Sequence, residues 1–187
     1  MDSILRQAVA RIDIVQGGKS GSRGTGFLVA PDLVLTALHV VGDRSAPTLT
    51  LLPGTIALTF PTHSTEATVV DGRVDARADW ILLRCAVPPP NVRPIPLSDS
   101  VEDGAAWETY GFPDANPRDG LAQIGTVTHA SGTFEGISAY QLFSDQASSG
   151  SGAPVKGASG GPVIVGGAIV GLLRASARCG HRRRATQ

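Results

Sequence analysis

Ser159 stands in the glycine-rich stretch GASGGPV (157–163), and its surroundings suit covalent chemistry. A serine hydroxyl becomes a good nucleophile when a base takes its proton, and the oxyanion that forms on attack needs hydrogen-bond donors. Glycines let backbone N–H groups turn toward one point, so Gly157 and Ser159 would supply the natural pair of donors. The alternative is a flexible connector, because the Gly-Ser-rich segment ASSGSGAPVK precedes this stretch.

His39 is the histidine best placed to act as the base. It directly follows the apolar run LVLTAL, where a histidine is either a core residue or one presented at the edge of a sheet. Three aspartates, Asp71, Asp75 and Asp79, precede the apolar run WILLRC, and Asp79 adjoins it. A carboxylate drawn inside needs a partner, and an imidazole N–H would serve while fixing the histidine tautomer. No role is indicated for the remaining histidines, His63, His129 and His181.

The elements that must position these side chains are predicted to be short strands. Turn signals recur every 8 to 15 residues between segments rich in Val, Leu, Ile and Thr, a spacing typical of an all-β sandwich or barrel. Gly166 and Gly167 separate two apolar runs and predict a tight hairpin. Only the first dozen residues look helical. Strands are expected near 26–29, 33–37, 48–52, 67–70, 79–85, 107–112, 123–130, 139–143, 162–165 and 168–173.

A proline-rich segment at mid-chain divides the sequence into two β halves. The stretch 86–104 holds five of the 13 prolines, and proline cannot serve the middle of a sheet. We therefore expect an N-terminal segment (1–20), a first β half with His39 and Asp79 (21–87) and a linker (88–104). A second β half with Ser159 (105–178) and a basic tail (179–187) would follow.

The composition excludes several classes of function. Hydrophobic residues make up 42% and charged residues 17% of the 187 residues, which is not the composition of a disordered chain. The 16 basic and 16 acidic residues cancel, so no nucleic-acid or membrane partner is expected. No run approaches the length of a membrane helix, and no secretory signal is recognised. Two cysteines favour a reducing, cytoplasmic setting. No cofactor or metal is expected.

Three blocks, TALHVV, ADWILL and GASGGPV, resemble in that order the catalytic blocks of trypsin-like serine peptidases. They are separated by 40 residues from His39 to Asp79 and by 80 from Asp79 to Ser159. The segments IPLSDSVEDGAAWETYGFP and GTVTHASG are similar to the second barrel of bacterial HtrA-like peptidases. The resemblance covers about residues 20 to 176.

The resemblance implies an all-β fold of two six-stranded antiparallel β-barrels with the active site between them. It makes His39 the general base, Asp79 its orienting acid and Ser159 the nucleophile, with an oxyanion hole formed by the N–H groups of Gly157 and Ser159. A strand at 173–176 would pair with an extended substrate. The residues expected at the substrate are Ala153, Leu173, Arg174, Ala175 and Ser176.

The sequence departs from the family pattern at several positions. Ala158 stands where digestive members have an aspartate that pairs with a newly released N-terminal amine, so activation by that route is not expected. Ala153 falls at the floor of the specificity pocket, which would then not select Lys or Arg. Arg174 is expected to point to solvent, with attraction of an acidic substrate group as the alternative.

The C-terminus departs further. The family pattern expects another strand after GLLRAS, where eleven residues remain. Either the chain is a piece of a longer protein or the second barrel, incomplete as it stands, closes differently, and a partner or downstream domain would cover the open edge. The sequence predicts a serine endopeptidase that acts on polypeptides. The alternative is a latent or non-catalytic module of a larger protein that needs a partner.

Overall fold

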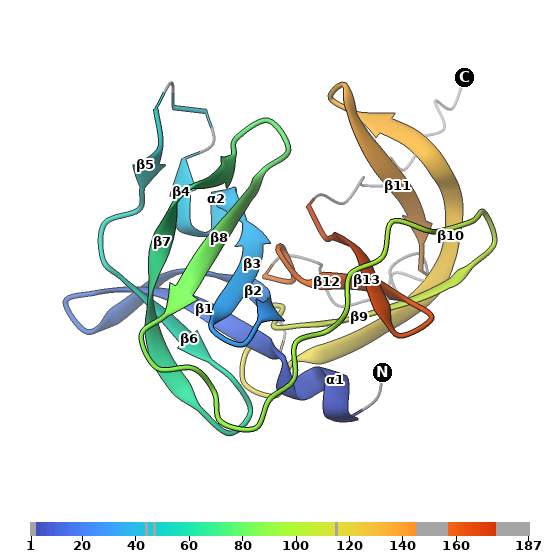
Figure 1. Cartoon of the computed structure of the whole chain (residues 1–187). Helices are drawn as coiled ribbons and strands as arrows, with labels where there is room; N and C mark the ends of the chain where they lie inside the picture. The colour runs from blue at the N-terminus through green and yellow to red at the C-terminus, as the bar shows by residue number, and fades with distance from the viewer. Residues whose placement is uncertain (1–2, 44, 47, 115, 145–156, 175–187) are drawn as a thin grey trace, which may run out of the picture.

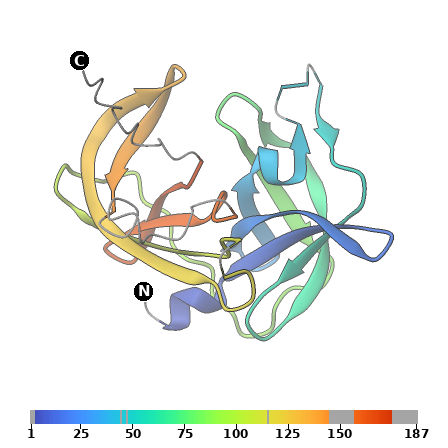
Figure 2. The same ribbon diagram turned by 180° about the vertical axis from the view of Figure 1, so that it is seen from behind.

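The computed structural model describes residues 3–43, 45–46, 48–114, 116–144 and 157–174, and these form two β halves that lie side by side (Figure 1). The only helices in this part of the chain are α1 (Ser3–Gln7) and the single turn α2 (Leu38–Val41). The first half contains the closed barrel, and the second is a curved sheet that opens away from it (Figure 2). The described residues therefore form an all-β fold, as predicted.

The first half is a closed antiparallel barrel of six strands in the order β1-β2-β3-β8-β7-β6. Its large buried side chains include Phe27, Leu28, Val34, Ile81 and Leu83, all 0% exposed. The strands are β1 (Val9–Gln16), β2 (Lys19–Ala30), β3 (Leu33–Ala37), β6 (Thr55–Thr59), β7 (Ser64–Asp75) and β8 (Trp80–Cys85). Beside the barrel lies a two-stranded sheet of β4 (Gly42–Asp43) and β5 (Thr50–Leu51).

The N-terminal boundary expected from the sequence is wrong. The barrel begins at β1 (Val9–Gln16) and not at residue 21, and the helix ends at Gln7. β1 pairs with β2 on one side and with β6 on the other, so it closes the barrel. Ala10, Ile12 and Ile14 alternate along the strand and are buried, and the β-branched isoleucines fit a pleated, half-buried surface.

The second half is a five-stranded sheet in the order β11-β10-β9-β12-β13. Six strands were expected, and residues 145–156 and 175–187 lie outside the described part of the chain. Gly166 and Gly167 join β12 to β13 with φ of 59° and 84°, which confirms the predicted glycine hairpin. The strands are β9 (Ala106–Gly111), β10 (Leu121–Phe134), β11 (Ile137–Phe143), β12 (Pro162–Val165) and β13 (Ala168–Leu172).

The remaining strand predictions overlap observed strands. The run 48–52 forms a strand only at Thr50–Leu51, and β4 (Gly42–Asp43) and β6 (Thr55–Thr59) were not predicted. The proline-rich segment between the halves contacts both of them. The N–H of Ile95 donates to Leu28 O in the first half at 3.3 Å, and Pro96 O accepts from Ile169 N–H in the second at 2.7 Å. Ile95 is only 1% exposed, so this segment is packed between the two halves.

Candidate active site

His39 lies on the single helical turn α2 that directly follows β3. Leu38, Val40 and Val41 are buried on either side of it and anchor the turn in the barrel core. The side chain of His39 remains 35% exposed. The barrel therefore fixes the backbone of this histidine while leaving part of its ring accessible.

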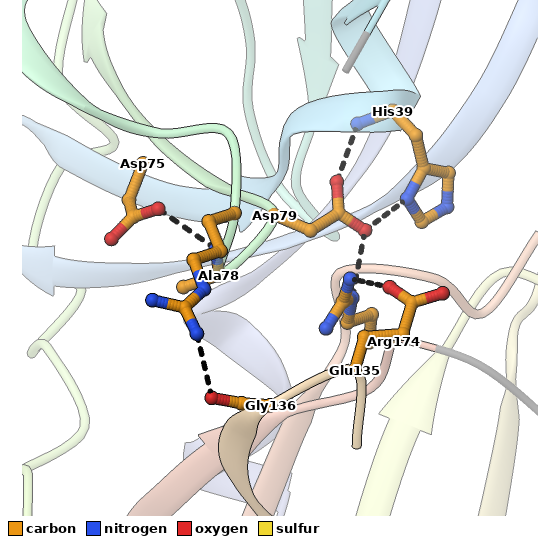
Figure 3. A network of polar contacts seen from close by, with 8 residues as sticks. His39, Asp75, Ala78, Asp79, Glu135, Gly136 and Arg174 are labelled. Atoms are coloured by element: carbon orange, nitrogen blue, oxygen red, sulfur yellow. Dashed lines mark hydrogen bonds and ion pairs between the residues drawn. The ribbon is translucent and has the colours of Figure 1, made fainter. Parts of the chain in front are cut away.

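His39 is held by Asp79 through two contacts (Figure 3). The Nδ1 atom of His39 lies 2.7 Å from Asp79 Oδ2, and the His39 backbone N–H donates to Asp79 Oδ1 at 3.1 Å. A carboxylate can only accept, so with an ionised Asp79 the imidazole proton lies on Nδ1. The Nε2 atom of His39 then carries the free lone pair that a general base requires.

Asp79 differs from the other two aspartates of this region in burial. Its residue is 0% exposed, whereas Asp71 is exposed and Asp75 is half-buried. Asp75 accepts the N–H of Ala78 at 2.8 Å and so shapes the turn that leads to Asp79. Asp79 itself has φ of 59°, a left-handed conformation that aspartate tolerates better than most residues. The prediction from sequence that Asp79 is the aspartate drawn inside is thus correct.

The loop that carries Ser159 is anchored to the first barrel by Thr25 of β2. The N–H of Thr25 donates to Ser159 O at 2.9 Å, and its hydroxyl donates to Gly157 O at 3.0 Å. The same hydroxyl accepts the N–H of Phe112 at 3.0 Å. Thr25 is 0% exposed, so these bonds are made in a buried environment between the two halves.

The serine loop also presses against the strand that leads to His39. A side chain on Gly160, whose φ is 81°, would place its Cβ 2.2 Å from Thr25 O and 2.8 Å from Ala37 N. Ala37 is the last residue of β3, two positions before His39. The Thr36 hydroxyl donates to Thr25 O at 2.7 Å and ties the two strands together at this point. The serine loop therefore lies against the end of β3, two positions before His39.

Two details of the serine loop bear on its chemistry. Within the described chain, the N–H groups of Gly157 and Ser159 donate to no protein acceptor. The hydrogen bonds of the described residues do not include one between Ser159 Oγ and the His39 ring. Gly157 has φ of 93°, and a Cβ there would lie 2.7 Å from Phe112 O, so this position requires glycine.

The segment after β13 lies along the serine loop. Leu173 accepts the N–H of Gly160 at 2.7 Å, and its own N–H donates to Gly161 O at 2.8 Å. The expectation that Arg174 points to solvent is wrong, because its side chain is only 14% exposed and lies beside Asp79. The other residues expected at the substrate, Ala153, Ala175 and Ser176, lie outside the described residues.

Sequence reasoning missed two residues of this region. Thr25 stands between glycines in RGTGF, a pattern that a tightly packed strand requires, since a Cβ at Gly24 would lie 2.5 Å from Val40 Cγ2. That pattern was a usable signal. Glu135, at the turn between β10 and β11, pairs with Arg174 at 2.6 Å and left no signal in the sequence.

Cys85 is not a competing nucleophile. Burial raises the pKa of its thiol to about 11, and the nearby Asp32 carboxylate acts in the same direction. The thiol is therefore protonated at neutral pH and a poor nucleophile. The described residues contain no group of three or more His, Cys, Asp or Glu side chains that could hold a metal ion. They also contain no helix long and apolar enough to cross a membrane.

Comparison with known proteins agrees with this geometry. The model of the family described as "Trypsin-like peptidase domain" matches residues 24–172. A probable serine protease of Lysobacter enzymogenes is 30% identical in an alignment that covers 50% of this chain. That alignment spans 20% of the Lysobacter protein, so the matched part of this chain covers about a fifth of that protein's length.

Solved structures share the fold. The active form of the Rv3671c protease of M. tuberculosis superposes with a TM-score of 0.69 and 23% identity, covering 92% of this chain and 72% of that one. Deg5 superposes with a TM-score of 0.70 and 17% sequence identity, and the match covers 91% of this chain and 80% of Deg5. A serine endoprotease from Yersinia pestis superposes with a TM-score of 0.67 and 20% sequence identity, and the match covers 92% of this chain and 55% of the Yersinia chain. With the family match over most of its length, and with its closed barrel beside a curved five-stranded sheet, the chain belongs to the trypsin-like peptidase domain family.

Proposed function

We propose that this chain is a serine endopeptidase with Ser159 as nucleophile, His39 as general base and Asp79 as the acid that orients the base. The observation that carries this proposal is the contact of 2.7 Å between His39 Nδ1 and the fully buried Asp79 Oδ2. This contact leaves Nε2 as the basic atom of the ring. The serine loop lies against the end of the strand that leads to His39.

The chemistry follows the acyl-enzyme route. His39 Nε2 takes the proton of Ser159 as its Oγ bonds to the peptide carbonyl carbon, and the carbonyl oxygen becomes an oxyanion. His39 then gives the proton to the leaving nitrogen as the C–N bond breaks. Water, deprotonated by His39, attacks the resulting ester and releases the acid, and the proton returns to Ser159.

The N–H groups of Gly157 and Ser159 are the proposed donors to the oxyanion, which they would stabilise only as charge develops. Family members that carry an aspartate at position 158 need an N-terminal amine to order this loop. Here Ala158 is buried at 3% exposure, and Thr25 supplies bonds on both sides of it. We infer that the loop is ordered by the barrel itself and needs no cleavage of the N-terminus.

The partners follow from this proposal. Leu173 and Arg174 lie next to the serine loop and would line the path of an extended polypeptide substrate. A downstream domain or a partner would cover the sheet beyond β13. The cytoplasmic, reducing setting stays a prediction from cysteine usage.

A fluorophosphonate probe tests the proposal, because it labels only an activated serine. We expect labelling of the wild-type chain and none of Ser159→Ala or His39→Ala. Ser138→Ala is the matched control, since Ser138 is an exposed serine on β11. Equal labelling of the Ser159→Ala variant would overturn the assignment. No labelling of a folded wild type, restored by a longer chain, would favour a latent module instead.

A further inference from the structure

Arg174 places a guanidinium directly beside the His39–Asp79 pair (Figure 3). Its Nε atom lies 3.5 Å from Asp79 Oδ2, the same oxygen that contacts His39 Nδ1. The Nε atom is buried and has no hydrogen-bond acceptor among the described residues, so its contact with Asp79 is electrostatic. An arginine is charged at every accessible pH, and this position therefore holds a permanent positive charge.

The other end of the guanidinium is held by the turn between β10 and β11. Arg174 Nη2 donates to Glu135 Oε2 at 2.6 Å, and the guanidinium carbon lies 5.3 Å from the centre of the Phe134 ring. Glu135 and Gly136 have φ of 53° and 74°, which makes this turn a tight hairpin. The hairpin thus fixes the direction in which Arg174 extends.

The same hairpin is attached to the loop that precedes Asp79. Arg77 donates to Gly136 O at 3.0 Å, a contact between the second half and the first. The charged side chains described on the elements that meet here are Arg174, Glu135, Arg77 and Asp75. Asp75 is engaged with the Ala78 N–H. Arg174 lies against the Asp79 carboxylate.

We propose that Arg174 is a positioning residue that holds the Asp79 carboxylate and sets the charge balance of the His39–Asp79 pair, with Glu135 as its counterion. The inference rests on the proposed function in that His39 is the base of the reaction. Two cationic groups, the His39 ring when protonated and the Arg174 guanidinium, face the same oxygen, Asp79 Oδ2. The Glu135 carboxylate pairs with the other end of the guanidinium, so the β10–β11 hairpin contributes to the charge balance at this oxygen.

The opposed charges of Arg174 and Glu135 give a test that a purely structural role would not pass. In the full chain, the titration of the His39 ring is followed by NMR, with its signal assigned by loss in His39→Gln. We expect Arg174→Gln to raise the titration midpoint relative to the wild type, because one of the two cationic groups at Asp79 Oδ2 is then removed. Glu135→Gln should lower it by a smaller amount, because Glu135 is 50% exposed and screened by water.

Two further variants control for charge and folding. Arg174→Lys keeps the charge and should keep the midpoint near the wild-type value. Arg84→Gln removes the same charge from an exposed pair with Asp32 on the barrel and should leave the midpoint unchanged. If Arg174→Gln does not fold, the shift of the His39 midpoint in Glu135→Gln is by itself the test of the inference. Unchanged midpoints, or shifts in the same direction for Arg174→Gln and Glu135→Gln, would overturn the inference.

The titration does not require catalysis, so the two proposals can fail separately. If labelling depends on Ser159 but the His39 titration midpoint does not change in the variants, the proposal of a serine peptidase stands and the proposed role of Arg174 is wrong. If the two variants shift the His39 midpoint in opposite directions but the chain is never labelled, the proposed role of Arg174 stands and the proposal of a serine peptidase is wrong. In an active enzyme, the acid limb of the kcat/KM profile should move in the same directions as the titration.

Discussion

The hydroxyl of Thr25 donates to the carbonyl oxygen of Gly157 at 3.0 Å, across 132 residues of sequence and from one half of the molecule to the other. The same hydroxyl accepts the Phe112 N–H, and the Thr25 backbone donates to Ser159 O. One buried threonine in a barrel strand thus holds the backbone on both sides of Ala158. These bonds are the basis of our proposal that the barrel, and not an N-terminal ion pair, orders the serine loop.

Thr25→Val keeps the shape of the side chain and removes both hydroxyl bonds, leaving the Phe112 N–H and Gly157 O without their partner. We expect a loss of about 1–3 kcal/mol in the free energy of unfolding, measured in urea, because these groups are buried. Labelling of Ser159 should slow as the loop loosens. Thr25→Ser keeps the hydroxyl and should retain most of the wild-type stability and labelling rate. A valine variant that labels at the wild-type rate would contradict the role of Thr25.

Asp79→Asn tests the orienting acid separately from the nucleophile. An amide can donate to His39 Nδ1 and stabilise the wrong tautomer, so we expect kcat to fall by about 10⁴ with little change in KM. The measurement is peptide or ester hydrolysis by the purified variant. Asp75→Asn is the matched control, since Asp75 accepts the Ala78 N–H in the same loop and an asparagine can still accept it. A comparable loss in Asp75→Asn would show that the effect comes from the loop and not from the base.

Gly160→Ala tests the contact between the serine loop and the first barrel. The added Cβ would lie 2.2 Å from Thr25 O at a φ of 81°, so we expect destabilisation by more than about 1 kcal/mol and loss of labelling. Gly166→Ala is the matched control: its φ is 59°, but no atom lies within 4 Å of an added Cβ. Gly166→Ala should lose only the stability that the left-handed backbone conformation costs an alanine, and it should keep its activity. Equal effects at both positions would argue against the contact.

The buried thiol of Cys85 predicts a pH dependence of stability. Its pKa rises from 9.0 to about 11 on folding, so the folded state favours the protonated thiol. The stabilising contribution is fully present below pH 9 and is lost as the pH rises from 9 toward 11. Urea unfolding at pH 8 and pH 10.5 measures it, with Cys85→Ala as control. The fall in stability should be smaller in that variant, and an equal fall would assign it to other groups.

The sequence by itself determined the class of fold and the candidate triad. Alternation and turn residues reported the strands and the Gly166–Gly167 hairpin, because both are local properties of the backbone. The contact of His39 with Asp79 was predictable for a different reason. Each residue adjoins an apolar strand, and β3 pairs with β8 in a register that sets Ala37 opposite Trp80. Ala37 stands two positions before His39, and Trp80 directly follows Asp79.

Tertiary structure alone decided which side chains meet around that triad. Strand β1 carries a local strand pattern in Ala10, Ile12 and Ile14, but its place in the barrel depends on pairing with β6, forty or more positions away. Arg174 was expected in solvent and is instead beside Asp79, because the β10–β11 hairpin carries Glu135 and Phe134 to it. The bonds of Thr25 to Gly157 and Phe112 likewise form only when the two halves dock. Spacing along the chain predicts local geometry, whereas contacts between separately folded surfaces depend on how those surfaces pack.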